Sequence, residues 1–242
     1  MSIIESSSLF EGWVTAFEML LDEGVNVVVP LIVSMSLKSD STEVPKELDM
    51  ALLENGCYSC NTTANTIFPN SYWNRDVERT KLYERYMKMI PVLKRADRNN
   101  RLGIYFERLI NYSLEERGGS FNQLEFIIRT YQRKNYRRSA LQASVFNPFK
   151  DLTHNKQRGF PCLQHVFFTP DIRNQTLMIT GVYATQHIFD RAYGNYLGLH
   201  RLGEFMAHEM GLTLNKVICI VSQAKLGHKI TKTQARVLLK KL

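Results

Sequence analysis

The chain has 242 residues, of which 44% are hydrophobic and 22% are charged. This composition is typical of a folded globular protein and excludes a mainly disordered chain. Lys and Arg number 31 against 23 Asp and Glu, which gives a formal charge of +8. A basic surface favours anionic partners such as phosphorylated metabolites, nucleic acid or acidic lipids, but it does not choose among them.

The sequence predicts neither a membrane span nor an export signal. The longest apolar stretch, residues 27–33, contains Pro30 and is far shorter than the roughly 20 residues that a spanning helix needs. Residues 1–10 lack the basic start and apolar run of a signal peptide. Four cysteines in a chain of this length do not suggest a disulfide scaffold. We therefore expect a cytoplasmic protein with no membrane partner.

Periodicity of apolar residues predicts the elements of the first half of the chain. We expect, in order, a helix over 10–21 closed by Gly24, a buried strand over 25–33, a loop over 39–45, a helix over 76–93 that ends before or near Pro91, and a helix opened by a capping box of Ser120 and Gln123.

The second half alternates apolar strands with one long apolar helix. We expect strands over 139–146, 162–168, 177–183 and 217–221, a turn over 171–174, a helix over 197–212 ended by Gly211, and a basic helical tail over 229–242. Strands and helices in this order predict a single α+β domain over 1–242, with one large mixed sheet packed against helices.

Cys162 is the strongest candidate for a reactive residue. It lies in the segment Phe160-Pro161-Cys162-Leu163, at the start of an apolar strand behind a polar loop that contains glycine. A thiolate at a strand edge can act as a nucleophile, and basic residues elsewhere could lower the pKa of the thiol. The alternative is a buried structural thiol.

Two further positions carry groups suited to ligand binding. Arg137 and Arg138 are adjacent arginines before a strand, and guanidinium groups match phosphate oxygens in pairs. They could equally belong to a solvated basic patch with Arg129, Arg133 and Lys134. Asn195 precedes the long apolar helix and could be its N-cap, or its carboxamide could recognise one edge of a heterocycle.

Other motifs are weaker. Cys57 and Cys60 form a lone CxxC without a second pair of ligands at zinc-site spacing, so we expect no metal. The basic tail could touch nucleic acid, but a charged terminus is more often solvated, and we do not favour a nucleic-acid partner.

Taken together, the segments resemble the thymidylate synthase and pyrimidine hydroxymethylase superfamily, most clearly over residues 99–227. The order of the segments carries the resemblance. They are Leu-Gly-Ile-Tyr-Phe-Glu-Arg-Leu at 102–109, Gly-Ser-Phe-Asn-Gln-Leu at 119–124, the arginine pair at 137–138, Asn-Pro-Phe-Lys-Asp-Leu at 147–152, Pro-Cys at 161–162, and Asn195 with the helix that follows.

The resemblance implies a fold, a chemistry and roles for residues. In that family a cysteine adds to C6 of a pyrimidine, and C5 then accepts a one-carbon unit from 5,10-methylenetetrahydrofolate. Cys162 would be the nucleophile, Tyr105 would assist proton transfer and Asn195 would read the pyrimidine edge. Arg137 and Arg138 would bind a phosphate in the neighbouring subunit's site, because the family builds its sites across a homodimer that forms through a sheet face.

The sequence departs from the family pattern at three places. Ala184 stands where the family has a phosphate-binding arginine, and His187 replaces the aspartate that contacts the folate ring. Residues 222–227 lack the His-x-Tyr pair that binds the sugar hydroxyl. Each lost hydrogen bond to a charged group costs on the order of 1.5–3 kcal/mol, so the departures predict an altered substrate pocket.

Two functions remain open from the sequence. The first is a thymidylate synthase-like methyl- or hydroxymethyltransferase that acts on a small anionic pyrimidine nucleotide or related heterocycle. The second is a binding or scaffold protein that kept the fold and lost the reaction. We favour the enzyme, because a degenerate site has little reason to keep the cysteine beside its proline.

Overall fold

A mixed β-sheet forms the centre of the computed structural model, which describes residues 1–36, 43–114, 118–154 and 160–242. Its strands, in spatial order, are β1 (Ser2–Ser6), β2 (Leu31–Ser36), β8 (Thr213–Lys225), β7 (Thr176–His187), β6 (Leu163–Asp171) and β5 (Gln142–Ser144). The pairs β1–β2 and β7–β8 are parallel, and the other neighbours are antiparallel. The predicted large mixed sheet is confirmed.

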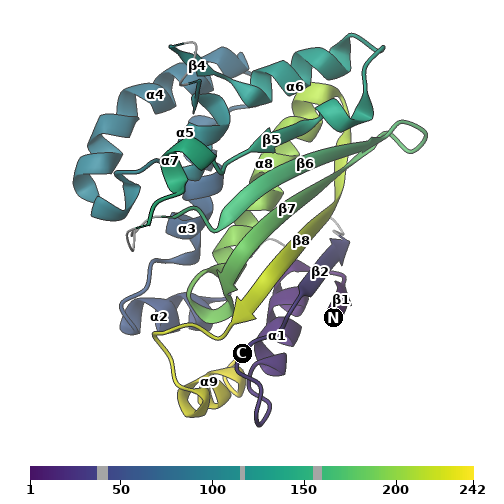
Figure 1. Cartoon of the computed structure of the whole chain (residues 1–242). Helices are drawn as coiled ribbons and strands as arrows, with labels where there is room; N and C mark the ends of the chain where they lie inside the picture. Colours follow the sequence, from purple (N-terminus) through teal and green to yellow (C-terminus); the bar gives the residue numbers. More distant parts are fainter. Residues whose placement is uncertain (37–42, 115–117, 155–159) are drawn as a thin grey trace.

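Helices pack against one face of this sheet, and α8 (Tyr193–Met210) lies along it behind β6, β7 and β8 (Figure 1). In β8 the buried side chains Val217, Cys219 and Val221 alternate with the more exposed Ile218 and Ile220, as the pleat of a strand requires. No helix in the described part of the chain covers the face that points toward the viewer in Figure 1.

The helix and the strand predicted near the N-terminus are both present, but their boundaries differ from the predicted ones. Helix α1 (Leu9–Met19) is capped by Ser8, and its C-cap is Leu20, so Gly24 does not close it. The strand expected over 25–33 begins only at Leu31, because Pro30 has no N–H to donate to a ladder. Before it, Val28 forms a single bridge to Ala224.

Two expected helix boundaries are wrong. Helix α4 (Arg79–Ala96) continues through Pro91. The exposed surface around this proline lets water satisfy the carbonyl that loses its N–H partner. Helix α6 (Gln123–Gln132) is capped by Asn122, whose side chain accepts from the N–H of Glu125 at 2.9 Å, so the Ser120 capping box does not form.

The helix α3 was missed because its sequence, Cys-Asn-Thr-Thr-Ala-Asn-Thr-Ile, has low helix propensity. It spans Cys60–Ile67 and packs closely against α8. A side chain at Gly198 of α8 would lie 2.9 Å from the Ala64 carbonyl, so the missing Cβ permits this approach. Tertiary contact, and not local preference, holds α3 in place.

The C-terminal half follows the predictions more closely. Strands β6, β7 and β8 are longer than expected, but only Gln142–Ser144 of the predicted strand over 139–146 is extended. Helix α8 starts four residues earlier than predicted, directly after the π-helix η5 (Ile188–Ala192), and ends at Gly211, whose φ is 68°. The tail forms α9 (Lys232–Leu239).

Short elements complete the fold. They are α2 (Lys46–Glu54), α5 (Tyr105–Ile110), α7 (Pro148–Asp151), the 3₁₀ turns η1 (Asn70–Tyr72), η2 (Arg98–Asn100) and η4 (Arg138–Ala140), and a small sheet of β3 (Tyr112–Ser113) and β4 (Ser120–Phe121). Of the loop predicted over 39–45, residues 39–42 lie outside the described part, and residues 43–45 have no regular structure. Across the described ranges, no helix has the length and apolar character needed to cross a bilayer.

Candidate active site around Cys162

A cavity of about 270 Å³ opens where the start of β6, the end of β7 and the start of α8 meet. Helix α3 and residues 99–105 close its other sides. Cys162, Tyr105, His187 and Asn195 all line it. Residues that are 90 positions apart in the sequence are therefore brought to one site, as the family resemblance predicts.

Cys162 stands one residue before β6, and its carbonyl accepts from the N–H of Ala184 on β7 at 2.9 Å. The Pro161 carbonyl accepts from the side-chain amide of Gln164, which fixes the turn into the strand. Solvent reaches Cys162, but the surrounding walls desolvate the sulfur and raise the pKa of the thiol, while the charge of Arg191 acts in the opposite direction. The alternative of a sealed structural thiol is therefore wrong for Cys162.

Tyr105 is the first residue of α5 and lines the cavity beside Cys162. Burial, and then the nearby Cys162, raise the pKa of its phenol to about 12, against the opposing effects of the Leu163 and Cys162 backbone and of Arg191. Tyr105 is therefore protonated at neutral pH and can donate a hydrogen bond or a proton, but it cannot serve as a base.

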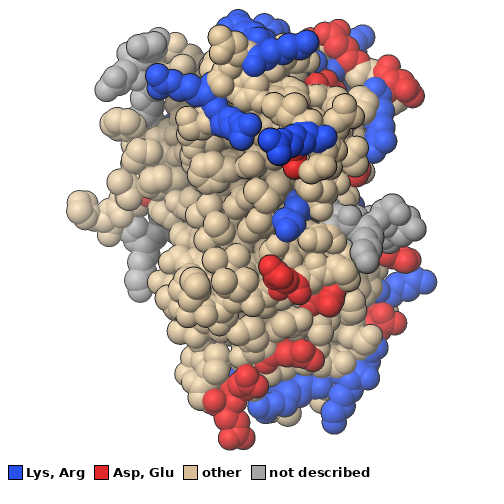
Figure 2. Space-filling model, turned by 90° about the vertical axis from the view of Figure 1, so that its right-hand side faces the viewer, with Lys and Arg blue, Asp and Glu red and all other residues tan. Residues whose placement is uncertain are grey.

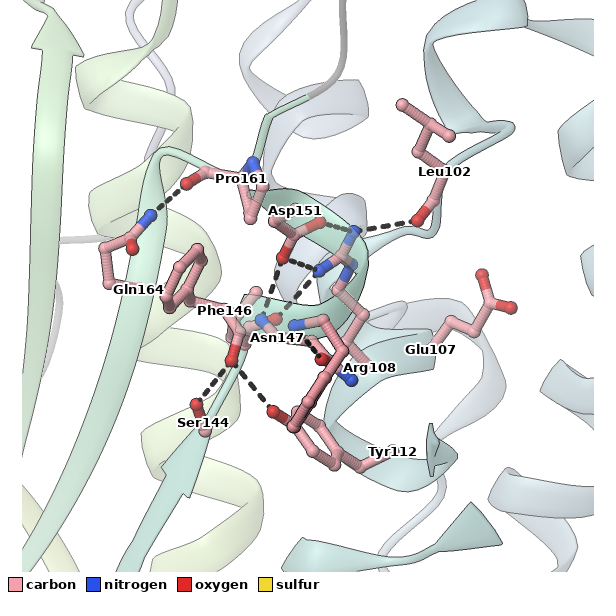
Figure 3. A network of polar contacts seen from close by, with 12 residues as sticks. Leu102, Glu107, Arg108, Tyr112, Ser144, Phe146, Asn147, Asp151, Pro161 and Gln164 are labelled. Atoms are coloured by element: carbon pink, nitrogen blue, oxygen red, sulfur yellow. Dashed lines mark hydrogen bonds and ion pairs between the residues drawn. The ribbon is translucent and has the colours of Figure 1, made fainter. Parts of the chain in front are cut away.

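A buried ion pair braces the segments on either side of this site. Arg108 of α5 donates to Asp151 of α7 through two nitrogens, at 2.6 and 2.8 Å, and to the carbonyls of Leu102 and Val145 (Figure 3). The Gln164 carbonyl accepts from the N–H groups of Val145 and Phe146. The network thus connects the loop before Tyr105 to the strand that follows Cys162.

Asn195 lies inside the first turn of α8, whose N-cap is Ala192, so its expected role as N-cap is wrong. It is 5% exposed, lines the cavity and makes no side-chain hydrogen bond to any described residue. Two other buried groups on the lining also lack a partner in the described structure, the Nε2 of Gln186 and the Oγ1 of Thr63. Each unpaired buried group is costly unless a ligand or water satisfies it.

Arg191 is the functional candidate that the sequence analysis missed. It lies in the π-helix η5, one turn before Asn195, and lines the cavity. Its guanidinium carbon lies 4.6 Å from the centre of the Tyr58 ring. A basic residue one helical turn before Asn195 was the signal available in the sequence, and π-helical turns are frequent at functional sites.

His187 ends β7 and lines the cavity, with its Nδ1 3.5 Å from the Asp190 carboxylate. Its ring packs edge-on against that of His228, with the ring centres 4.6 Å apart. Asp190 is not part of the lining, so the wall itself presents an imidazole where the resemblance expects a carboxylate.

Arg137 and Arg138 are exposed and do not line this cavity. Figure 2 shows Lys and Arg side chains gathered at the upper end of the molecule, where Figure 1 places α6. Exposed cations follow that helix at Arg133, Lys134, Arg137 and Arg138. The arginine pair is thus separate from the Cys162 site of its own chain.

Cys57 and Cys60 are both free thiols, and burial raises the pKa of each. Within the residues that the structure describes, no group of three or more His, Cys, Asp or Glu side chains could hold a metal ion.

Comparison with known proteins finds a partial match. A protein of Methanocaldococcus jannaschii described as "Putative thymidylate synthase" is 32% identical over 111 residues. The match covers 45% of this chain and 47% of the other, so the chain spans about half the length of the curated relative it matches. No protein-family model matches the chain. The similarity suggests a relationship to thymidylate synthase-like proteins.

Proposed function

We propose that the protein is a thymidylate synthase-like transferase, in which Cys162 adds to C6 of a pyrimidine nucleotide or related heterocycle and C5 accepts a one-carbon unit. The observation that carries the proposal is the solvent-accessible Cys162 thiol in a cavity that it shares with Tyr105 and Asn195. A cavity of about 270 Å³ suits one small planar ligand.

The first step uses groups of this chain alone. The Cys162 thiol releases its proton to water, the sulfur of the thiolate forms a bond to C6, and the electron pair of the C5–C6 double bond moves toward C5 and the C4 carbonyl. Tyr105, which remains protonated, donates to the developing negative charge. Asn195 offers a donor and an acceptor to the edge of the ring. After C5 has taken the one-carbon unit, it gives its proton to water, the electron pair of the C5–H bond re-forms the C5–C6 double bond, and the sulfur leaves C6 as a thiolate.

The resemblance names 5,10-methylenetetrahydrofolate as the donor of the one-carbon unit, which would supply a methylene group. The lining fits this cofactor only in part, because His187 replaces the expected carboxylate and Asp190 stands outside the lining. We therefore assign no step to folate and leave the methyl and hydroxymethyl products as two forms of the same proposal.

The homodimer is part of the proposal, because the uncovered sheet face offers a surface for a second copy. A row of residues crosses five paired strands of this face: His165, Val182, Ile220, Ile32 and Ile3. Ile220 is 36% exposed and Ile3 is 57% exposed. If Arg137 and Arg138 serve the partner's site, a mixed dimer of Cys162→Ser and the Arg137→Gln/Arg138→Gln variant contains one intact site, with the cysteine from one chain and the arginines from the other. Mixing the two variants should therefore restore adduct formation. If mixing restores none, the sites are not shared between subunits.

Mass spectrometry of a trapped adduct tests the reaction. The protein is incubated with 5-fluoropyrimidine nucleotides, with and without methylenetetrahydrofolate, because the fluorine at C5 cannot leave as a proton would. We expect a covalent adduct on the peptide that contains Cys162. Cys162→Ser should abolish it, and Cys57→Ser, a change at another free thiol, should not. Failure of the whole panel to modify Cys162 would refute the proposal.

The alternative, an inactive binding or scaffold protein, is favoured by Ala184. It stands directly opposite Cys162 at the position where the resemblance expects a phosphate-binding arginine. This alternative predicts that a pyrimidine nucleotide binds equally well to the wild type and to Cys162→Ser in calorimetry, and that neither forms an adduct.

A further inference from the structure

The cavity contains a positive charge, that of Arg191, with which no described carboxylate forms an ion pair. Arg191 forms no ion pair and donates no hydrogen bond to any described residue, although a guanidinium carries five N–H donors. Three other arginines with limited exposure use their donors within the protein: Arg79 contacts Glu125 and Glu209, Arg108 contacts Asp151, and Arg201 donates to the amide oxygens of Asn61 and Asn65. A guanidinium that lines a cavity with its donors unused is suited to an anion.

The surroundings of Arg191 hold its head group without using its donors. The Tyr58 ring packs against the guanidinium, and the hydroxyl of Tyr58 is fixed by Asp97 and by the Asn99 amide. The adjacent Asp190 carboxylate does not pair with Arg191: its Oδ2 lies 3.5 Å from the Nδ1 of His187 and accepts from the backbone N–H of His228 at 3.5 Å, and its Oδ1 is buried without a hydrogen-bond partner among the described residues. Cation–π contact orients a guanidinium and leaves its edge free for hydrogen bonds.

A second observation also points to a ligand. Asn195, one turn after Arg191, is 5% exposed, lines the same cavity and makes no side-chain hydrogen bond to any described residue. The position opposite Cys162, in contrast, carries Ala184, which has no donor to offer an anion. The cavity therefore holds its cation on the α8 side, in the chain that also supplies Cys162.

We propose that Arg191 binds the anionic group, a phosphate or carboxylate, of the ligand that occupies the Cys162 cavity. This inference deepens the proposed function by naming the anion-binding residue, and it does not require that the ligand be a pyrimidine. It makes the anion site an intrachain one, independent of Arg137 and Arg138 of a second copy.

Protection of Cys162 from alkylation tests this assignment. Iodoacetamide labelling of the full chain is followed at the Cys162 peptide by mass spectrometry, with and without inorganic phosphate and, separately, deoxyuridine monophosphate. The readout is the ratio of rates with and without the anion, so that any change in the intrinsic reactivity of the thiol cancels.

Three variants give the comparison. Arg191→Gln should weaken protection by phosphate about tenfold or more, and Arg191→Lys, which keeps the charge but loses the planar fork, should weaken it less. Lys229→Gln is the matched control, because Lys229 is a nearby exposed cation that acts on Cys57 but does not line the cavity. It should leave the protection unchanged. Circular dichroism checks that each variant is folded.

The outcomes separate this proposal from the transferase. Protection by phosphate that depends on Arg191, without any adduct with fluoropyrimidines, would support the anion site and refute the reaction. No protection in the wild type by either anion, or equal protection in Arg191→Gln, would refute the role of Arg191 whatever the reaction proves to be.

Discussion

Arg108 and Arg191 line two neighbouring cavities that share Gly103, and the fold uses the two side chains differently. Arg108 lies behind the loop, where Asp151 and two carbonyls engage its donors. Arg191 lies in the Cys162 cavity, where its charge meets only the face of an aromatic ring among the described residues. Gly103 contributes to the lining on both sides.

The contrast extends to the neutral polar groups. Around Arg108, the Gln123 amide bonds to Ser144 and to the Arg108 carbonyl, and the Tyr112 hydroxyl bonds to Phe146. Around Arg191, Gln186 and Thr63 leave buried atoms unpaired. Fully paired networks rigidify a fold, whereas unpaired buried groups mark a place where the fold has given up stability. We infer that the first region supports and the second one binds.

The largest effect on stability should come from Asp151→Asn. This change leaves the buried Arg108 cation without its counter-ion, and we expect a loss of about 3–5 kcal/mol in the free energy of unfolding, measured by urea titration. Glu204→Gln, which breaks the exposed pair with Arg75, is the control and should cost no more than about 1 kcal/mol. Equal losses in the two variants would contradict the division between supporting and binding regions.

A smaller effect concerns the pH dependence of Cys162. Because burial raises the pKa of this thiol above its ordinary value, and only the thiolate reacts, the alkylation rate of the ligand-free protein should still be rising with pH where that of the urea-unfolded chain levels off. Arg191→Gln removes the cation that lowers the pKa of this thiol, so the midpoint of the plot of alkylation rate against pH should move to still higher pH. A midpoint below that of the urea-unfolded chain would show that the cavity activates the thiol instead.

The same two regions show what the sequence could predict. The apolar strands were foreseen because their buried and exposed residues alternate, and α8 was foreseen because its apolar residues recur at helical spacing, although the structure buries it on most sides. Cys162 was chosen because its neighbours resemble a family segment. Helix α3 was missed, since contact with glycines of α8, and not its own composition, makes it helical. With it, the part of the cavity formed by Thr63 and Thr66 was missed.

Arg191 was missed for a related reason. The family pattern consists of single positions, and it places an arginine where this chain has Ala184. It could not show that a π-helical turn brings a different arginine to the same cavity. The positions of charges in space depend on such turns, which short-range periodicity does not encode.

The smallest effect, and one of opposite sign, is expected for Gln186→Leu. Leucine has a similar volume. It removes a buried amide whose Nε2 has no partner among the described residues, and it loses only the long hydrogen bond, 3.5 Å, that the Oε1 accepts from the Tyr196 hydroxyl. The fold should therefore be unchanged or gain no more than about 0.5 kcal/mol. If the amide serves a ligand, the same variant should bind deoxyuridine monophosphate more weakly in calorimetry. Thr66→Val, a change at a lining residue whose hydroxyl already donates to the Thr63 carbonyl at 2.7 Å, is the control and should lose stability instead. A destabilised Gln186→Leu with unchanged binding would mean that this amide supports the fold, and the contrast between the two regions would then fail at its most buried residue.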